Sequence, residues 1–206
     1  MVNEVIPDIV VGRLPLYLRT LQLMLAESRQ VTSSQELGER LGISAAQIRK
    51  DLSQFGEFGK QGTGYDIFFL VEQLKSILHV NKIWDMVVVG AGDVGHAISR
   101  YQGFSNRGFH VAMVFDNDPQ KIGQKINDFT VQDIANLTSY VQEKGITIAM
   151  LAVPAAQAQQ VTDMLVGGGV KAIVNYAPIN LSVPKGVLVQ YIDPVVHLQR
   201  MSFYLE

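Results

Sequence analysis

The feature that most constrains this chain is a glycine-rich hexapeptide, Gly90-Ala91-Gly92-Asp93-Val94-Gly95, which has the form G-x-G-x-x-G. It follows an apolar run at 83–89 and precedes a helical pattern. In such a strand–loop–helix unit the first glycine allows a tight turn, the second lets a pyrophosphate approach the backbone, and the third lets helix and strand pack closely. The hexapeptide therefore predicts a dinucleotide site with the phosphates at a helix N-terminus.

Asp116 supplies the second part of this prediction, because it lies 21 positions after the third glycine, at the end of the next expected strand. A carboxylate there would accept hydrogen bonds from both ribose hydroxyls of an adenosine and would repel a 2′-phosphate. We therefore expect NADH and NAD+ as cofactors rather than their 2′-phosphorylated forms. The alternative is purely structural: the glycines only make a turn, and Asp116 only caps a loop.

From residue 83 onward, apolar runs alternate with helical periodicity. This alternation predicts an α/β fold with a doubly wound parallel sheet of the Rossmann type. Asp118-Pro119 is expected to start a helix, with Asp118 as its cap. The expected strands are 83–89, 110–115, 146–153, 172–175 and 187–191, and the expected helices are 94–104, 132–144 and 155–166.

Three further cofactor contacts are expected where strands end. In an open parallel sheet, ligands bind at the carboxyl ends of the strands. Val153 and Pro154 close one expected strand, and Tyr176 follows another. Ordinary strand–helix turns remain the alternative at both places.

The first 80 residues are dominated by helical patterns. A helix with one apolar face is expected over 14–27. Ser33-Ser34-Gln35-Glu36 and Ser44-Ala45-Ala46-Gln47 both have the form of a capping box, and Gly42 stands where the first of the two helices would stop. Two short helices joined by a tight glycine turn predict a helix-turn-helix.

The second of these helices, over 45–55, has the layout of a DNA-recognition helix. Ile48, Leu52 and Phe55 face the core, while hydrogen-bond donors and small side chains face outward. Such side chains contact guanine edges, phosphates or a thymine methyl group. The solvated face of an ordinary amphipathic helix is the alternative. The candidate DNA contacts here are Ser44, Ala46, Gln47, Arg49, Lys50 and Ser53.

A wing is expected after this helix. Four glycines surround Lys60 between 56 and 65, and an apolar run follows at 66–71, which together predict a short β-ribbon that carries a lysine to the DNA. Lys60 and Gly62 join the candidate DNA contacts. Residues 1–80 hold eight basic and nine acidic residues, so a single copy would bind weakly. A dimer that offers two heads would relieve this.

Composition excludes several classes of protein. The chain has 206 residues, is 48% hydrophobic and carries a formal net charge of −2, which fits one or two compact units and excludes disorder. With no cysteine there is no disulfide and no thiolate zinc site. We expect a cytoplasmic protein without membrane or metal partners. The expected domains are a winged helix at 1–80, a nucleotide domain at 81–193 and a terminal helix at 194–206, with a hinge at 75–81.

Several motifs resemble the Rex family of redox-sensing transcriptional repressors. The resemblance rests on Ile48-Arg49-Lys50-Asp51-Leu52, Phe55-Gly56-Glu57-Phe58-Gly59-Lys60 and Gly64-Tyr65-Asp66. It continues through the glycine hexapeptide, Phe115-Asp116-x-Asp118-Pro119, Ala152-Val153-Pro154-Ala155 and Asn175-Tyr176-Ala177-Pro178. It spans nearly the whole chain, and the joining of a winged helix to this nucleotide domain is more specific than either half.

The resemblance implies a homodimer that represses genes of fermentation and anaerobic respiration. It implies binding to a palindromic operator in double-stranded DNA when NADH is scarce, and release when NADH binds. It also implies that the last helix is exchanged between subunits near the partner's nicotinamide pocket. Arg13, Tyr101 and Asp193 would couple nucleotide to DNA binding. Asp93 departs from the uncharged residue common in such loops, which puts affinity rather than identity in doubt.

The terminal helix supports this exchange on its own pattern. Such a broad apolar surface at a chain end needs a second wall, which another subunit can supply. Docking on its own sheet is the alternative. The apolar stripe consists of Val195, Leu198, Met201 and Leu205, widened by Val196 and Tyr204.

An NAD-dependent dehydrogenase is the alternative function. It needs an acid or base near the nicotinamide, but His79 and His110 lie away from strand carboxyl ends, and His96 and His197 are expected on helices. No residues remain for a domain that would enclose a substrate. We therefore expect a protein that is not an enzyme. A CoA- or nucleotide-binding module with the same type of sheet is a third option.

Overall fold

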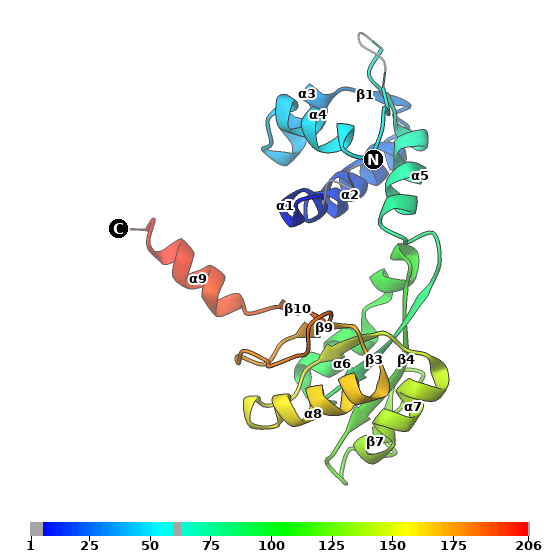
Figure 1. The fold of residues 1–206 in the computed structure, drawn as a ribbon, viewed down its shortest axis with the longest axis vertical. Coiled ribbons are helices and arrows are strands. Elements are labelled where there is room, and N and C mark those ends of the chain that lie inside the picture. The colour runs from blue at the N-terminus through cyan, green and yellow to red at the C-terminus, as the bar shows by residue number, and fades with distance from the viewer. Residues whose placement is uncertain (1–5, 60–62, 206) are drawn as a thin grey trace. The chain divides into compact units, whose positions relative to one another are not determined.

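The computed structural model describes residues 6–59 and 63–205, which form two compact units (Figure 1). The first unit spans Met1–Lys82 and the second spans Ile83–Glu206. The division falls just after a helix, α5, that covers part of the expected hinge, so residues 75–77 are helical rather than linking.

Helices dominate the first unit, and a two-stranded antiparallel sheet joins them. Ser33 and Ser44 cap α3 and α4 by accepting hydrogen bonds from the backbone N–H groups of Glu36 and Gln47, and Gly42 ends α3 in the left-handed conformation at φ 68°. These caps confirm the expected helix-turn-helix. The elements are α1 (Asp8–Val11), α2 (Leu14–Ala26), β1 (Val31–Thr32), α3 (Ser34–Leu41), α4 (Ala45–Ser53), β2 (Tyr65–Asp66) and α5 (Ile67–Ile77).

The first capping box is only half formed. The Glu36 carboxylate accepts from the hydroxyl of Thr32 and from Arg29, so in the described structure it does not reach back to the N-cap. The helix start is therefore fixed by Ser33 alone, and Glu36 instead ties α3 to the segment before it.

The core of the first unit forms around α2. Leu14, Tyr17, Leu21 and Met24 are fully buried and pack against α3, α4 and α5. The span Asp8–Ala26 is long and apolar enough to cross a membrane by length and composition, with a hydropathy of 1.3. Its apolar side chains at these four positions lie in the core of the unit, while others such as Leu16 and Leu23 are exposed, and 28% of the span's most apolar window is buried.

The apolar run at 66–71, which we expected to follow the glycines as part of a β-ribbon, is helical from residue 67 onward. Asp66 caps a helix by accepting a hydrogen bond from Phe69 N, and α5 buries Ile67, Leu70 and Leu74 at helical spacing. Within 56–59 and 63–71, the described part of the expected ribbon, only Tyr65–Asp66 (β2) is a strand, and it pairs with β1 (Val31–Thr32). Lys60 and Gly62 lie outside the described residues.

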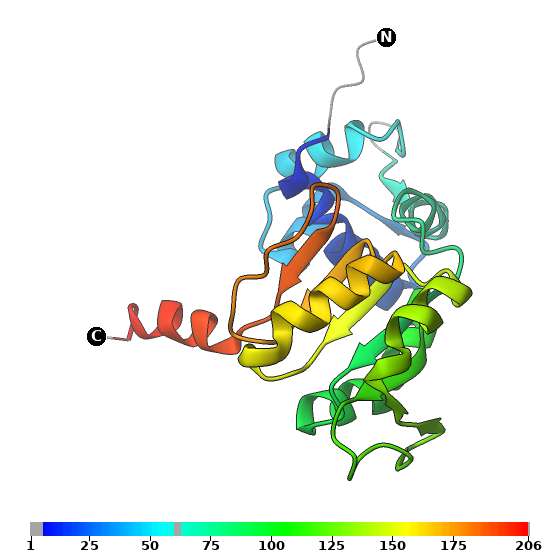
Figure 2. The ribbon, with the colours of Figure 1, turned by 60° about the horizontal axis from the view of Figure 1, so that its bottom comes forward.

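The second unit is a six-stranded parallel sheet in the order β10-β9-β8-β3-β4-β7, as expected of a doubly wound fold. Val87 and Val89 of β3 face α7 and α8, while Met86 and Val88 face Ile98 of α6, so both faces are covered. Figure 2 shows α7 and α8 side by side over one face. The main elements are β3 (Trp84–Val89), α6 (Asp93–Arg100), β4 (Phe109–Asp116), β7 (Gln132–Asp133), α7 (Leu137–Lys144), β8 (Ile148–Leu151), α8 (Ala155–Gly168), β9 (Ala172–Asn175), β10 (Leu188–Tyr191) and α9 (Pro194–Ser202).

Three stretches of this unit differ from expectation. Asp118-Pro119 starts a turn rather than a helix: Asp118 accepts from Gln120 N, and the hairpin β5 (Lys125–Ile126) and β6 (Phe129–Thr130) follows. The expected helix at 132–144 begins late, because β7 and a 3₁₀ turn (Ile134–Asn136) precede α7. Likewise α6 stops at Arg100 and a 3₁₀ segment, Gln102–Arg107, follows.

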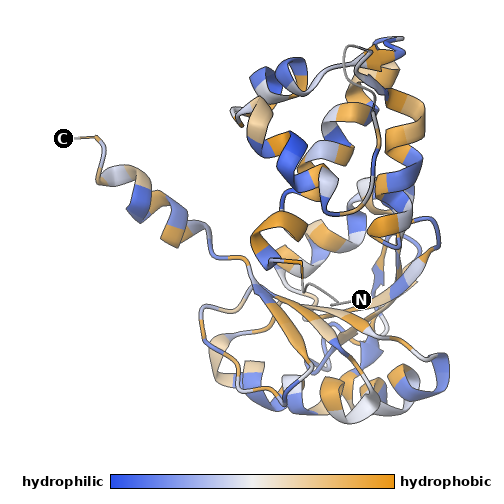
Figure 3. Cartoon of the chain, turned by 45° about the horizontal axis from the view of Figure 1, so that its top comes forward, coloured by the Kyte–Doolittle hydropathy of each residue, from blue (hydrophilic) through white to orange (hydrophobic). Residues whose placement is uncertain are grey.

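None of the residues of α9 is buried. Val195, Val196, Leu198 and Met201 are each more than half exposed, so the chain's own sheet does not cover them. Figure 3 shows both apolar and polar bands along this helix. The helix ends at Ser202, so the expected stripe is wrong in placing Tyr204 and Leu205 on it.

Candidate nucleotide site and candidate DNA-contacting helix

The three glycines of the hexapeptide have three different surroundings. Gly90 has φ 103°, and a side chain there would collide with the carbonyl oxygen of Ala152. A side chain at Gly95 would collide with the carbonyl oxygen of Gly90, which is the close helix–strand packing expected of the third glycine. At Gly92 an added Cβ would meet nothing within 4 Å. The loop is therefore tight at both ends and open in the middle.

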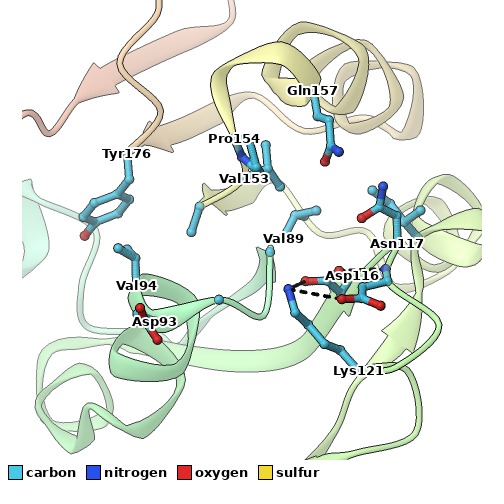
Figure 4. A pocket seen from close by; sticks show the side chains of 15 residues that line it. Val89, Asp93, Val94, Asp116, Asn117, Lys121, Val153, Pro154, Gln157 and Tyr176 are labelled. Carbon is cyan, nitrogen blue, oxygen red and sulfur yellow. Dashed lines mark hydrogen bonds and ion pairs between the residues drawn. The ribbon is translucent and has the colours of Figure 1, made fainter.

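A cavity of about 480 Å³ lies over this loop, at the carboxyl ends of β3, β4 and β8 (Figure 4). Tyr176 and Val94 lie at one end of it, and Asp116 and Lys121 lie at the other (Figure 4). Such a volume suits a small-molecule ligand. The predicted cofactor contacts that line it are Gly90, Gly92, Asp93, Val94, Asp116, Val153, Pro154 and Tyr176.

Two predicted cofactor contacts, Ala91 and Gly95, do not line this cavity. Ala91 is buried and lines a neighbouring hollow with His96 and Arg100, and Gly95 is packed against Gly90. Both residues therefore determine the shape of the loop without facing this cavity.

Asp116 is buried with 6% exposure and ties the loop to the turn after β4. It accepts hydrogen bonds from the backbone N–H groups of Ala91 at 2.6 Å and Asp118 at 2.8 Å, and from the Lys121 ammonium at 3.3 Å. Burial alone would raise the pKa of Asp116, but these donors lower it below its ordinary value. The carboxylate is therefore ionised at neutral pH, and it ties the glycine loop to the turn after β4 at this end of the cavity.

Sequence reasoning missed some of the residues that line the cavity. Lys121 follows Asp118 by three residues in the turn, and its ammonium lies 3.9 Å from the Asp118 carboxylate. Because we expected a helix after Asp118, the sequence analysis did not place Lys121 beside Asp116. Lys121 brings a cation close to Asp116, which weakens the negative field there. Asn117, Ile134 and Gln157 also line the cavity without any motif to mark them.

The tyrosine end of the cavity is held by a buried amide. Asn175 is 1% exposed; its Nδ2 donates to the carbonyls of Ala177 and Ile179, and its Oδ1 accepts from Ala177 N. These bonds fix the turn that carries Tyr176. Burial raises the pKa of the Tyr176 hydroxyl, so that hydroxyl stays neutral. With Val94 and Val153, this end of the cavity is mainly apolar.

The outward face of α4 is open to solvent. Ile48 and Leu52 are buried as expected, whereas Gln47 is half-buried. Arg49 donates from Nη1 to the Ser34 hydroxyl on α3 at 2.8 Å, so part of its guanidinium is held in place. The exposed candidate contacts are Ser44, Ala46, Arg49, Lys50 and Ser53.

The core side of α4 carries a carboxylate that the sequence analysis did not single out. Asp51 is fully buried and accepts from Arg13, Tyr17 and Gln47. Burial alone would raise the pKa of Asp51, but these three donors lower it. Burial beside Asp51 raises the pKa of the Tyr17 hydroxyl, so the hydroxyl stays protonated and donates a hydrogen bond to the carboxylate.

Known proteins match both units. A family model described as "CoA binding domain" matches residues 81–179, and one described as "Putative DNA-binding protein N-terminus" matches residues 5–53. A redox-sensing transcriptional repressor Rex from Chloroflexus aggregans is 53% identical over 97% of this chain and 94% of its own length. This chain belongs to the Rex family. Another Rex, from Streptomyces coelicolor, is 42% identical over 97% of this chain and 77% of its own length.

Solved Rex structures match the architecture. The crystal structure of RSP in complex with β-NAD+ and operator DNA has a TM-score of 0.93 at 37% identity, and covers 98% of this chain and 94% of that one. RSP in complex with β-NADH has a TM-score of 0.89 at 35% identity, with coverages of 98% and 95%. The winged-helix and Rossmann-type assignment is confirmed. The Rex relatives are named repressors, so this family is one of transcriptional regulators rather than enzymes.

The three coupling residues implied by the Rex resemblance have local partners in this structure. Arg13 pairs with Asp51. Tyr101 is half exposed and packs edge-on against Phe104. Asp193 caps α9 by accepting a hydrogen bond from Val195 N. Arg13 and Asp193 stand at the N-caps of α2 and α9, and Tyr101 stands at the C-cap of α6.

Proposed function

We propose that this chain is a homodimeric repressor that binds a palindromic operator in double-stranded DNA and is released by NADH. One observation carries the proposal: a single chain of the Rex family holds both an open-faced α4 and a cavity over a glycine loop. A fold of high similarity has been solved with NAD+ and operator DNA. The parts act as a DNA-binding head at 1–80, a nucleotide domain at 81–193 and an exchanged helix at 194–206, in the cytoplasm.

The cavity fits a dinucleotide by its own chemistry. The space above Gly92 is open, and the N-terminus of α6 directs backbone N–H groups toward it, which suits a pyrophosphate. Asp116 stands at the end where an adenosine ribose would bind, and its Oδ1 atom has one protein donor, so it can accept from a hydroxyl as well. Gly90, Ala91 and Gly95 give the loop its shape.

The end of the cavity that carries Tyr176 would discriminate between NADH and NAD+. Oxidised nicotinamide carries a positive ring charge that the reduced ring lacks. Val94, Val153 and Pro154 offer this ring an apolar surface, and Tyr176 is neutral. Removing a charge from water into such surroundings is unfavourable, so this end favours NADH.

The DNA head is tested by charge removal on α4. Arg49→Ala or Lys50→Ala should weaken binding to an operator selected from a random duplex pool by about tenfold, and each should lower the salt dependence by about one phosphate contact. NADH affinity should not change, because both residues lie outside the nucleotide unit. Lys75→Ala is the matched control, since it removes a cation of α5 that pairs with Glu72. Equal loss in the control, or loss of NADH binding, would count against this interface.

A further inference from the structure

Asp51 has a complete set of hydrogen-bond donors. Its Oδ2 accepts from Arg13 Nε at 2.6 Å and Tyr17 Oη at 2.5 Å, and its Oδ1 accepts from Arg13 Nη2 at 2.8 Å and Gln47 Nε2 at 2.7 Å. Arg13 and Tyr17 belong to α2, whereas Gln47 and Asp51 belong to α4. The carboxylate is fully buried, and its four acceptor positions are all used. Asp51 therefore links the start of α2 to Gln47, which lies at the edge of the solvent-facing side of α4.

This link fixes the direction of the Gln47 amide. An ionised carboxylate only accepts hydrogen bonds, so the amide must turn its NH₂ group toward Asp51. The amide oxygen, on the other arm of the planar group, is then directed away from the carboxylate. One N–H is used by Asp51, and the oxygen and the second N–H remain. Gln47 is half-buried, so these groups are within reach of solvent.

We propose that Asp51 is a positioning residue for DNA readout: it holds Gln47 so that its amide presents one acceptor and one donor to an adenine edge in the major groove. This proposal rests on the proposed function. Adenine offers an N6 donor and an N7 acceptor, which match the free oxygen and free N–H of the amide. Guanine offers two acceptors, which the fixed oxygen would repel.

Holding the side chain in advance also strengthens readout. A free glutamine loses considerable rotamer entropy when it is immobilised, and this cost is avoided when the bound orientation exists beforehand. The arrangement separates Gln47 from Lys50, whose side chain is exposed and makes no hydrogen bond or ion pair with any described residue. The unrestrained ammonium of Lys50 can contact DNA in many geometries, whereas the held amide of Gln47 can form hydrogen bonds in one geometry only.

The chain offers matched controls. Gln35 donates from Nε2 to Glu39 Oε1 at 3.1 Å on α3, which is the same type of bond four residues apart, but on an exposed pair outside α4. Tyr17→Phe removes one donor to Asp51 and leaves the Gln47 bond in place. Gln35→Ala removes a glutamine–carboxylate bond elsewhere, and Tyr17→Phe perturbs the buried network. Neither substitution breaks the bond between Gln47 and Asp51.

The experiment measures base preference. The unaltered protein selects an operator from a random duplex pool, and each half-site position is then varied in competition binding. Gln47→Met should reduce the preference for adenine at one position of each half-site by about tenfold. Asp51→Asn should reduce it similarly, because the asparagine amide can donate to the Gln47 oxygen and reverse the group. Gln35→Ala and Tyr17→Phe should keep the preference.

The outcomes separate this proposal from the proposed function. If the unaltered protein selects no duplex, the repressor function itself fails. If a duplex is selected but Gln47→Met or a folded Asp51→Asn keeps the adenine preference, the positioning role is wrong. Should Asp51→Asn not fold, side-chain amide hydrogen exchange decides in the unaltered chain. One Gln47 N–H should exchange at least tenfold more slowly than those of Gln35, and equal rates would overturn the proposal.

Discussion

Two buried carboxylates, Asp51 and Asp116, anchor the two functional surfaces of this chain. Each is ionised because neighbouring donors outweigh the cost of burial. Asp116 could be identified from its distance to the glycine loop alone. Asp51 carried a weaker signal: it lies three residues after Ile48 and four before Phe55, so a charged residue occupies a core-facing position of its helix.

Substitution of Asp116 tests the nucleotide end of the cavity. Asp116→Ala removes the acceptor of Ala91 N and the expected acceptor of the ribose hydroxyls, at a cost of about 2 kcal/mol, so NADH should bind at least tenfold more weakly. The rejection of NADPH should also relax, since the repelling carboxylate is removed and Lys121 loses the nearer of its two carboxylate partners, which leaves its ammonium able to pair with a 2′-phosphate. Fluorescence titration with both nucleotides measures this.

The control for this substitution is Asp128→Ala, which removes an exposed carboxylate between β5 and β6. It should leave both affinities unchanged. An unaltered ratio of NADH to NADPH affinity in Asp116→Ala would contradict the assigned role of Asp116 in selectivity.

At the scale of elements, the sequence predicted what local pattern controls. Serine caps and a glycine stop located α3 and α4, and continuous apolar runs located β3, β4, β8 and β9. The run at 66–71 was taken as part of a β-ribbon because it follows four glycines around Lys60. Its Asp66 cap and its burial at helical spacing show that tertiary packing decided for a helix.

The lining of the cavity likewise contains residues that local sequence patterns predict and residues that they do not. Its glycines, Asp116, Val153, Pro154 and Tyr176 follow from motif and strand ends, because parallel strands bring their carboxyl ends together. Lys121 and Gln157 could not be predicted, since their positions depend on an irregular turn and on the rotation of α8.

Two alanine substitutions separate loop shape from ligand space. Gly95→Ala forces a methyl group against the carbonyl of Gly90, so it should destabilise the second unit by about 2–3 kcal/mol. Gly92→Ala meets no neighbour and should leave stability unchanged, yet its methyl group occupies the space above the loop and should reduce NADH affinity at least tenfold. Unfolding followed through Trp84, the single tryptophan, on β3, gives the first quantity.

A reversed result would contradict this account of the glycine loop. Normal stability in Gly95→Ala would mean that α6 does not pack on Gly90 as described. Normal NADH binding in Gly92→Ala would place the phosphates elsewhere.

At the scale of the whole molecule, the exposed apolar face of α9 predicts self-association. Removal of residues 194–206 should leave the sheet folded, because no residue of α9 is buried in it. The truncated chain should sediment as a monomer, and its operator affinity should fall more than tenfold as two linked heads become one. Sedimentation velocity measures the first effect and a gel-shift titration the second.

A pair of point variants serves as the control for truncation. Leu198→Asp places a charge on α9, and Phe68→Asp places one on a similarly exposed apolar residue of α5. Only the first should dissociate the assembly. A truncated chain that still sediments as a dimer would show that other surfaces hold the two copies together.

The central claim is that NADH and operator DNA oppose each other through one protein, and calorimetry tests it directly. The selected operator duplex is titrated into the protein alone, with saturating NADH, and with an equal concentration of NAD+. A preference of ~100-fold for the DNA-free state corresponds to about 2.7 kcal/mol per site. The account predicts that NADH weakens operator binding by at least tenfold and NAD+ by much less. Identical operator affinity in all three titrations would contradict it.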